Sequence, residues 1–182
     1  RTYPIDARWY VLGVFLGRAV FVLGTVLLGL VVAGLVVPLT GAAQLSVVAS
    51  HPTADSPALY LRYARAAALF LLVVLAIATL VSATARSMRG GLALATGTVV
   101  ALVVGLDSAL LGSLGGGTVS PEGSTALLAF SPDSAYRSIV FELSVAPTGV
   151  TVPDGPTVLV STVALCAWLA LALGLASRLA WR

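Results

Sequence analysis

Residues 66–85 read AAALFLLVVLAIATLVSATA, twenty consecutive positions without a charged side chain. A helix of this length is about 30 Å long at a rise of about 1.5 Å per residue, which matches the hydrocarbon core of a bilayer. A buried helix of a soluble protein is the alternative for any single run of this kind. The stretch is therefore the first candidate for a membrane span.

Three further apolar runs have the same character: 19–37 (AVFVLGTVLLGLVVAGLVV), 90–106 (GGLALATGTVVALVVGL) and 157–177 (TVLVSTVALCAWLALALGLAS). Four such runs in 182 residues argue against a set of buried soluble helices. We expect an all-α fold, a polytopic membrane bundle of four spanning helices in a single transmembrane domain, 1–182. With their ends extended, the spans are expected at about 13–37, 62–84, 90–113 and 156–179.

The composition excludes several classes of protein. Charged residues make up 9% of the chain and hydrophobic residues 59%, whereas a soluble domain has about 25% charged residues. The net charge of +3 comes from arginines scattered at the ends of the apolar runs, so no nucleic-acid partner is expected. One Cys and one His leave no disulfide framework and no Cys/His metal site within the chain, and no cofactor is expected in it.

The arginines also predict an orientation. Cytoplasmic loops near spans collect arginine, and a cytoplasmic N-terminus places six arginines inside and three outside. The inner six are Arg1, Arg8, Arg86, Arg89, Arg178 and Arg182. We expect a multi-pass protein of the plasma membrane, with both termini of this segment cytoplasmic. Because the chain starts without Met and its first apolar run is too long for a signal peptide, we also expect a natural N-terminus upstream.

The outer connection, 120–145, is predicted to contain a short amphipathic helix. Ser131-Pro132-Asp133 places a hydroxyl at the N-cap, proline at the first helical position and an acid where the helix dipole favours it. Apolar residues then recur along one face: Ala135, Tyr136, Ile139, Val140 and Leu143. Asp133 and Arg137 have the spacing of a helical ion pair. The segment is too short to span, so we expect an interfacial or re-entrant helix, either a lid or a gate.

The third run carries a small side chain at every fourth position: Ala93, Gly97, Ala101, Gly105 and Ala109. A small-residue ridge of this kind lets another helix approach closely, and that helix belongs either to this chain or to a second protomer. Asp107 is the only acid within an apolar run. Acids inside membranes are functional candidates, but Asp107 is expected near the outer boundary, which favours a snorkelling or capping role.

No catalytic constellation is found. His51 stands in a proline-bounded loop without a nucleophile motif, and the chain has neither lysine nor the G-x-x-x-x-G-K-[ST] pattern of an ATP site. A membrane-embedded enzyme needs paired polar residues inside the membrane, and Asp107 alone supplies no pair. We therefore expect no enzymatic activity in this chain, and any energy source must be a partner or an ion gradient.

Two stretches resemble a known family. Residues 2–8 (TYPIDAR) with 11–18 (VLGVFLGR) resemble the cytoplasmic entry to the third span of ABC-2-type permeases, in particular the group containing the nitrous-oxide-reductase maturation permease. Residues 130–137 (FSPDSAYR) are similar to that family's Asn-Pro-x-Asp-x-Tyr-Arg segment before the last span. Three departures are visible: Ser131 replaces the asparagine, Asp133 stands one place early, and Val14 occupies a position where lysine is usual.

The resemblance implies a permease half that lacks the family's first two spans, pairs with a second permease protomer and lies in membrane lipid. A separate ABC ATP-binding subunit, which holds ATP and Mg, would drive transport. By the same resemblance, Pro4, Asp6 and Arg8 belong to a coupling segment for that subunit, and Arg86 and Arg89 to a second contact. Pro132, Asp133, Tyr136 and Arg137 would form the outer gate. The alternative function is a non-transporting membrane scaffold or accessory protein.

Overall fold

The computed structural model describes residues 6–39, 57–85, 87–116, 127–149, 151 and 155–180. These ranges are almost entirely helical and contain no strand, so the all-α prediction is confirmed for them. The elements are α1 (Ala7–Leu39), α3 (Pro57–Thr84), α4 (Met88–Val100), η2 (Ala101–Gly105), α5 (Leu106–Gly115), α7 (Pro132–Val140), η3 (Phe141–Val145), η4 (Ala146–Thr148) and α8 (Val158–Leu179). Of these, η2 and η3 are π-helical turns and η4 is a 3₁₀ turn.

Three helices are long and apolar enough to cross a membrane: Arg8–Leu35 in α1, Ala58–Thr84 in α3 and Val158–Leu179, which is α8. The shortest has 22 residues and is about 33 Å long, enough for a hydrocarbon core of about 30 Å. Only 17% to 22% of each apolar window is buried inside the chain. The remaining apolar surface needs lipid or further helices around it, as in a multi-pass membrane protein.

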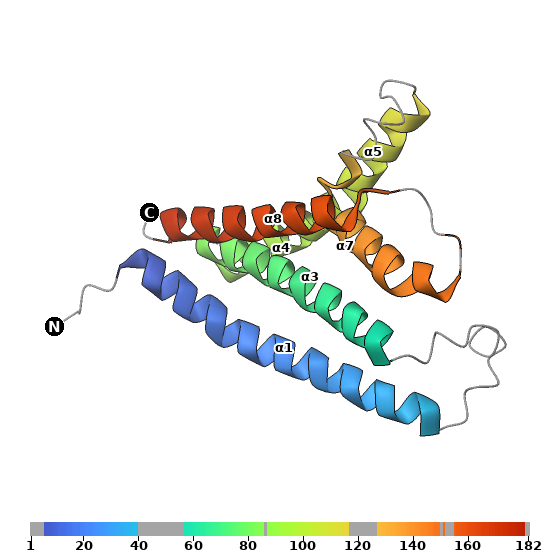
Figure 1. The fold of residues 1–182 in the computed structure, drawn as a ribbon. Coiled ribbons are helices and arrows are strands. Elements are labelled where there is room, and N and C mark those ends of the chain that lie inside the picture. Colours follow the sequence, from blue (N-terminus) through green and yellow to red (C-terminus); the bar gives the residue numbers. More distant parts are fainter. Residues whose placement is uncertain are drawn as a thin grey trace.

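The third predicted span, 90–113, is helical but is not one uninterrupted helix. α4 has 13 residues and α5 has 10, and the five-residue π-helical turn η2 separates them. In Figure 1, α4 lies beside the bundle while α5 points away from it. A π-helical turn is a common cause of a helix kink. The described chain therefore has three helices of spanning length and one broken helix, instead of the four spans predicted.

α3 lies at the centre of the bundle and contacts α1, α4, α7 and α8. One core cluster joins Phe15 of α1 with Ala76 of α3 and Ala172 of α8. Small residues at these crossings let the helices approach closely, which replaces the hydrophobic driving force that is missing in lipid. A second tie holds α1 to α3, because the hydroxyl of Tyr60 donates a hydrogen bond to the backbone carbonyl of Leu30.

The bundle has two ends, which Figure 1 shows at opposite sides. α1 begins, α3 ends, α4 begins and α8 ends at one of them, and we call this the Arg89 end. α1 ends while α3 and α8 begin at the other, which we call the Glu142 end. There the side chain of Glu142 accepts a hydrogen bond from the backbone N–H of Val158, at 3.1 Å, and so caps the start of α8.

Candidate functional site

α7 begins where the Ser-Pro-Asp pattern predicts. The Ser131 side chain accepts a hydrogen bond from the backbone N–H of Ser134 at 3.4 Å, and Pro132 occupies the first turn. The predicted ion pair is also present, with 2.8 Å between Arg137 Nη2 and Asp133 Oδ2. Local sequence signals therefore suffice to place both ends of this helix.

The apolar stripe of α7 faces the bundle and enters its core. The buried cluster around it combines residues of α3, α7 and α8: Ala66, Val73, Ala135, Ile139 and Leu165. Tyr136 also stacks on Phe70 of α3, with ring centroids 4.6 Å apart and 17° between the planes. α7 is thus packed between two long helices and does not lie across the end of the bundle.

Two hydrogen bonds give the position of α7 along α8. The indole Nε1 of Trp168, in the middle of α8, donates to the backbone carbonyl of Phe130 at 2.9 Å, just before α7 begins. The bond between Glu142 and Val158 lies after α7 and at the first residue of α8. The segment from Phe130 to Glu142 therefore runs antiparallel to the first half of α8. Its start lies at the mid-depth of the bundle.

Replacing Trp168 by phenylalanine is expected to weaken this anchor. The variant keeps a ring next to Phe130, whose own ring makes an edge contact with Trp168, but leaves the Phe130 carbonyl without its donor. A hydrogen bond between membrane helices contributes about 0.6 kcal/mol on average and at most about 1.7, so we expect a loss of about 1 kcal/mol. Detergent-induced unfolding of the purified protein measures it.

Trp9→Phe is the matched control, because Trp9 lies at the start of α1 with 71% of its surface exposed. We expect no change of stability for Trp9→Phe. The same unfolding midpoint for both variants would mean that the indole hydrogen bond does not hold the start of α7 in place.

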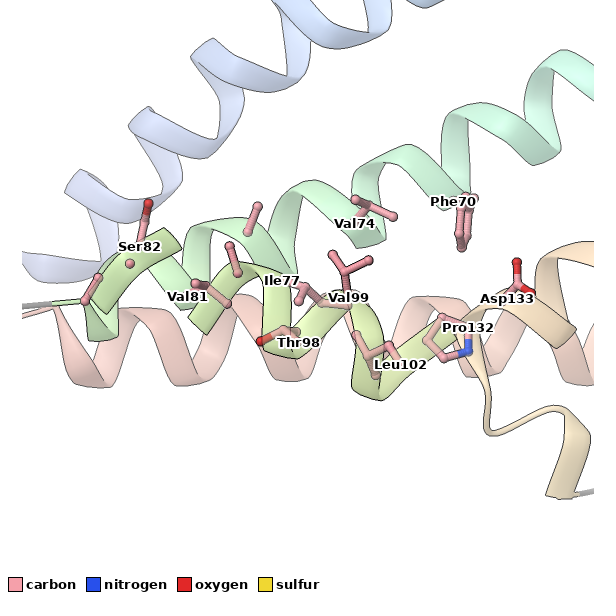
Figure 2. Close-up of a pocket in the computed structure, with 14 residues that line it drawn as sticks. Phe70, Val74, Ile77, Val81, Ser82, Thr98, Val99, Leu102, Pro132 and Asp133 are labelled. Carbon is pink, nitrogen blue, oxygen red and sulfur yellow. The ribbon is translucent and has the colours of Figure 1, made fainter. Parts of the chain in front are cut away.

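A cavity of about 480 Å³ lies between α3 and α4. Figure 2 shows Val74 and Ile77 of α3 facing Val99 and Leu102 of α4 across it. Its lining is apolar except for three side chains: Ser82, Thr98 and Asp133. Pro132 and Asp133 stand at its deep end, where α7 begins. α7 thus occupies the half of the bundle toward the Glu142 end, and the cavity occupies the other half.

The residues predicted to contact an ATPase lie toward the Arg89 end where they are described. Asp6, Arg8 and Arg89 are all exposed. The Asp6 side chain accepts a hydrogen bond from the backbone N–H of Arg8 at 3.2 Å, at the start of α1. Pro4 and Arg86 lie outside the described residues.

The small-residue ridge has no partner among the described helices. All five of its residues are exposed: Ala93, Gly97, Ala101, Gly105 and Ala109. A Cβ atom added to Gly97 would meet nothing within 4 Å. α4 turns a different set of residues toward α3, among them Ala95 and Val99, which line the cavity. Of the two predicted partners, a helix in the described part of this chain is therefore excluded.

Some predicted residues are not placed by the structure. Asp107 belongs to α5, but its side chain is outside the described part of the chain. His51 and the Ser120-Pro121-Glu122 stretch also lie outside it. Sequence reasoning in turn missed Trp168 and the cavity. Trp168 had a usable signal, because an indole N–H within an apolar helix needs an acceptor.

The lining of the cavity gave no such signal, because its residues have the same composition as a surface that faces lipid. Comparison of the chain with protein-family models, with curated proteins and with solved structures finds no match. Any functional argument therefore rests on the geometry described above and on the two stretches that resemble ABC-2-type permeases.

Proposed function

We propose that this chain is the permease subunit of an ABC-2-type transporter, which moves a substrate across the plasma membrane with energy from a separate ATP-binding subunit. The observation that carries the proposal is the position of α7. The stretch 130–137, which resembles the family's segment before the last span, is inserted between α3 and α8 down to the mid-depth of the bundle. A helix in this position lines the path of a substrate at one membrane face, as a gate must.

The opposite end of the bundle has the features that a cytoplasmic partner needs. Arg8 and Arg89 come from helices far apart in the sequence, yet both are exposed toward the Arg89 end. Exposed charges of one sign favour docking of a complementary surface. With the N-terminus cytoplasmic, as the arginine distribution predicts, this end faces the ATP-binding subunit and the Glu142 end faces outward.

In this mechanism, closure of the ATP-binding subunits moves the start of α1 and the turn between α3 and α4. Because α3 also contacts α7, this movement reaches the outer gate. Pro132, Asp133, Tyr136 and Arg137 are the gate residues of the proposal. The broken helix α4–η2–α5 serves as the fourth span, with its π-helical turn next to the start of α7.

Purification of the native protein in mild detergent, followed by mass-spectrometric identification of what stays bound, tests the proposal. An ATP-binding-cassette subunit in stoichiometric amount is the expected result. Recovery of the chain without any ATPase would contradict the proposal and favour the scaffold function.

A second protomer is the proposed partner of the small-residue ridge on α4. Gly97→Leu should therefore prevent close approach of two copies and shift the protein from dimer to monomer. Gly174→Leu on α8 is a matched control, since Gly174 is also exposed and a Cβ atom there also meets nothing within 4 Å. Native gel electrophoresis measures both. Unchanged assembly of Gly97→Leu, or equal loss in both variants, would show that the ridge is not the dimer contact.

A further inference from the structure

The cavity between α3 and α4 has the size of a ligand site. Its volume of about 480 Å³ lies within the range of about 300–1,000 Å³ that is usual for small-molecule pockets. No helix among the described residues fills it, although α3 packs closely against α1, α7 and α8. The lining supplies apolar side chains over its whole length and few polar groups, so the ligand that it fits is itself largely apolar.

The cavity also has the length of one leaflet. Along α3 its lining extends from Phe70 to Ala85, which corresponds to about 22 Å at about 1.5 Å per residue. Half of a bilayer measures about 20–22 Å when the headgroup region is included. The cavity begins at the Arg89 end, where Ala85 and Gly91 line it, and stops at mid-depth, where Pro132 closes it.

Charges at the two ends set the direction of a ligand. Arg89 is exposed in the first turn of α4, two residues before the lining residue Gly91, and brings a cation to the mouth. Asp133 lines the deep end, and its charge is already matched by Arg137 at 2.8 Å. The deep end therefore excludes an anionic group and does not require a cation. An anionic headgroup fits only at the mouth.

We infer that this cavity binds one acyl chain of an anionic phospholipid from the leaflet at the Arg89 end. The chain lies between Val74 and Ile77 of α3 and Val99 of α4, and its methyl end meets Pro132. The headgroup stays at the membrane surface beside Arg89. The site goes beyond the transporter proposal, because it depends only on the cavity and on the position of α7.

Photo-crosslinking on the unmodified protein tests the inference. The probe is phosphatidylglycerol with a photoactivatable diazirine near the end of one acyl chain, in vesicles of phosphatidylcholine. Adducts are expected on Val74 and Val99, and Leu159 and Val163 of α8 serve as lipid-facing references because they are 73% and 60% exposed. We expect about tenfold more adduct in the cavity, which corresponds to a preference of about 1.4 kcal/mol. Equal labelling at all four positions would overturn the inference.

Two variants fill the cavity and one matched variant does not. Ala95→Phe on α4 and Ala78→Phe on α3 each place a ring among the lining residues. Ala170→Phe introduces the same change on an exposed position of α8. Either cavity variant should abolish the excess adduct on the facing helix, while Ala170→Phe should keep it. Adducts that persist in both correctly folded cavity variants would contradict the site, and the map of the unmodified protein stands if neither variant folds.

The headgroup part of the inference has its own test. A phosphatidylcholine probe with the same acyl chain should give about tenfold less cavity adduct than phosphatidylglycerol, a difference of about 1.4 kcal/mol. Arg89→Gln should remove this difference without removing the adducts. Equal labelling by both probes in the unmodified protein would exclude an anionic lipid. A cavity labelled only by a soluble apolar probe would exclude a lipid altogether.

Discussion

Leu165→Ala is expected to lower the free energy of unfolding by about 2 kcal/mol, close to the lower limit of the range of about 2–5 kcal/mol for such changes in protein cores. Leu165 is fully buried and belongs to the cluster that joins α3 and α7 to α8. Its truncation leaves a void that the rigid neighbours cannot fill. The expected value is low because, in lipid, the loss is mainly one of packing and hardly one of transfer from water.

Leu159→Ala on the same helix is the matched control. Leu159 is 73% exposed, so lipid occupies the space that its side chain leaves, and we expect a change within about 0.5 kcal/mol. Titration of the folded protein with a denaturing detergent, followed by tryptophan fluorescence, measures both. If Leu165→Ala were no more destabilising than Leu159→Ala, the packing of α7 against α3 and α8 would be wrong.

Much of this fold follows from short-range signals in the sequence. A run such as 66–85 dictates a helix in lipid, because every backbone N–H and C=O group must be satisfied within the segment. Ser131 and Pro132 define a helix start through one side-chain hydrogen bond and one fixed backbone angle. The stripe on α7 was predicted from its spacing, and its members Ala135 and Ile139 are buried as expected.

The features that the sequence did not predict depend on which helix lies beside which. Apolar runs give a length but no direction, so the kink between α4 and α5 at η2 was not visible in 90–113. The small residues at Gly97 and Gly105 indicated a packing face, but α3 packs on another face of α4. The depth of α7 likewise depends on Trp168, which is distant from it in the sequence.

Reversal of Arg86 and Arg89 to glutamate is expected to uncouple the transporter from its ATP-binding subunit. By resemblance both arginines belong to the second cytoplasmic contact, and Arg89 is exposed there. Like charges placed against each other at an interface cost several kcal/mol, and each 1.4 kcal/mol corresponds to about a factor of ten in affinity. We therefore expect at least about a tenfold loss of substrate-stimulated ATP turnover in reconstituted vesicles.

The matched control reverses Arg178 and Arg182, because both also belong to the predicted cytoplasmic set and Arg178 is exposed in the last turn of α8. The two double variants change the net charge equally, and any reversal of membrane orientation through lost arginines should affect both alike. A loss confined to Arg86 and Arg89 supports a specific contact. Normal stimulated turnover in that variant would remove the turn between α3 and α4 from the docking surface, and equal loss in both would attribute the effect to overall charge.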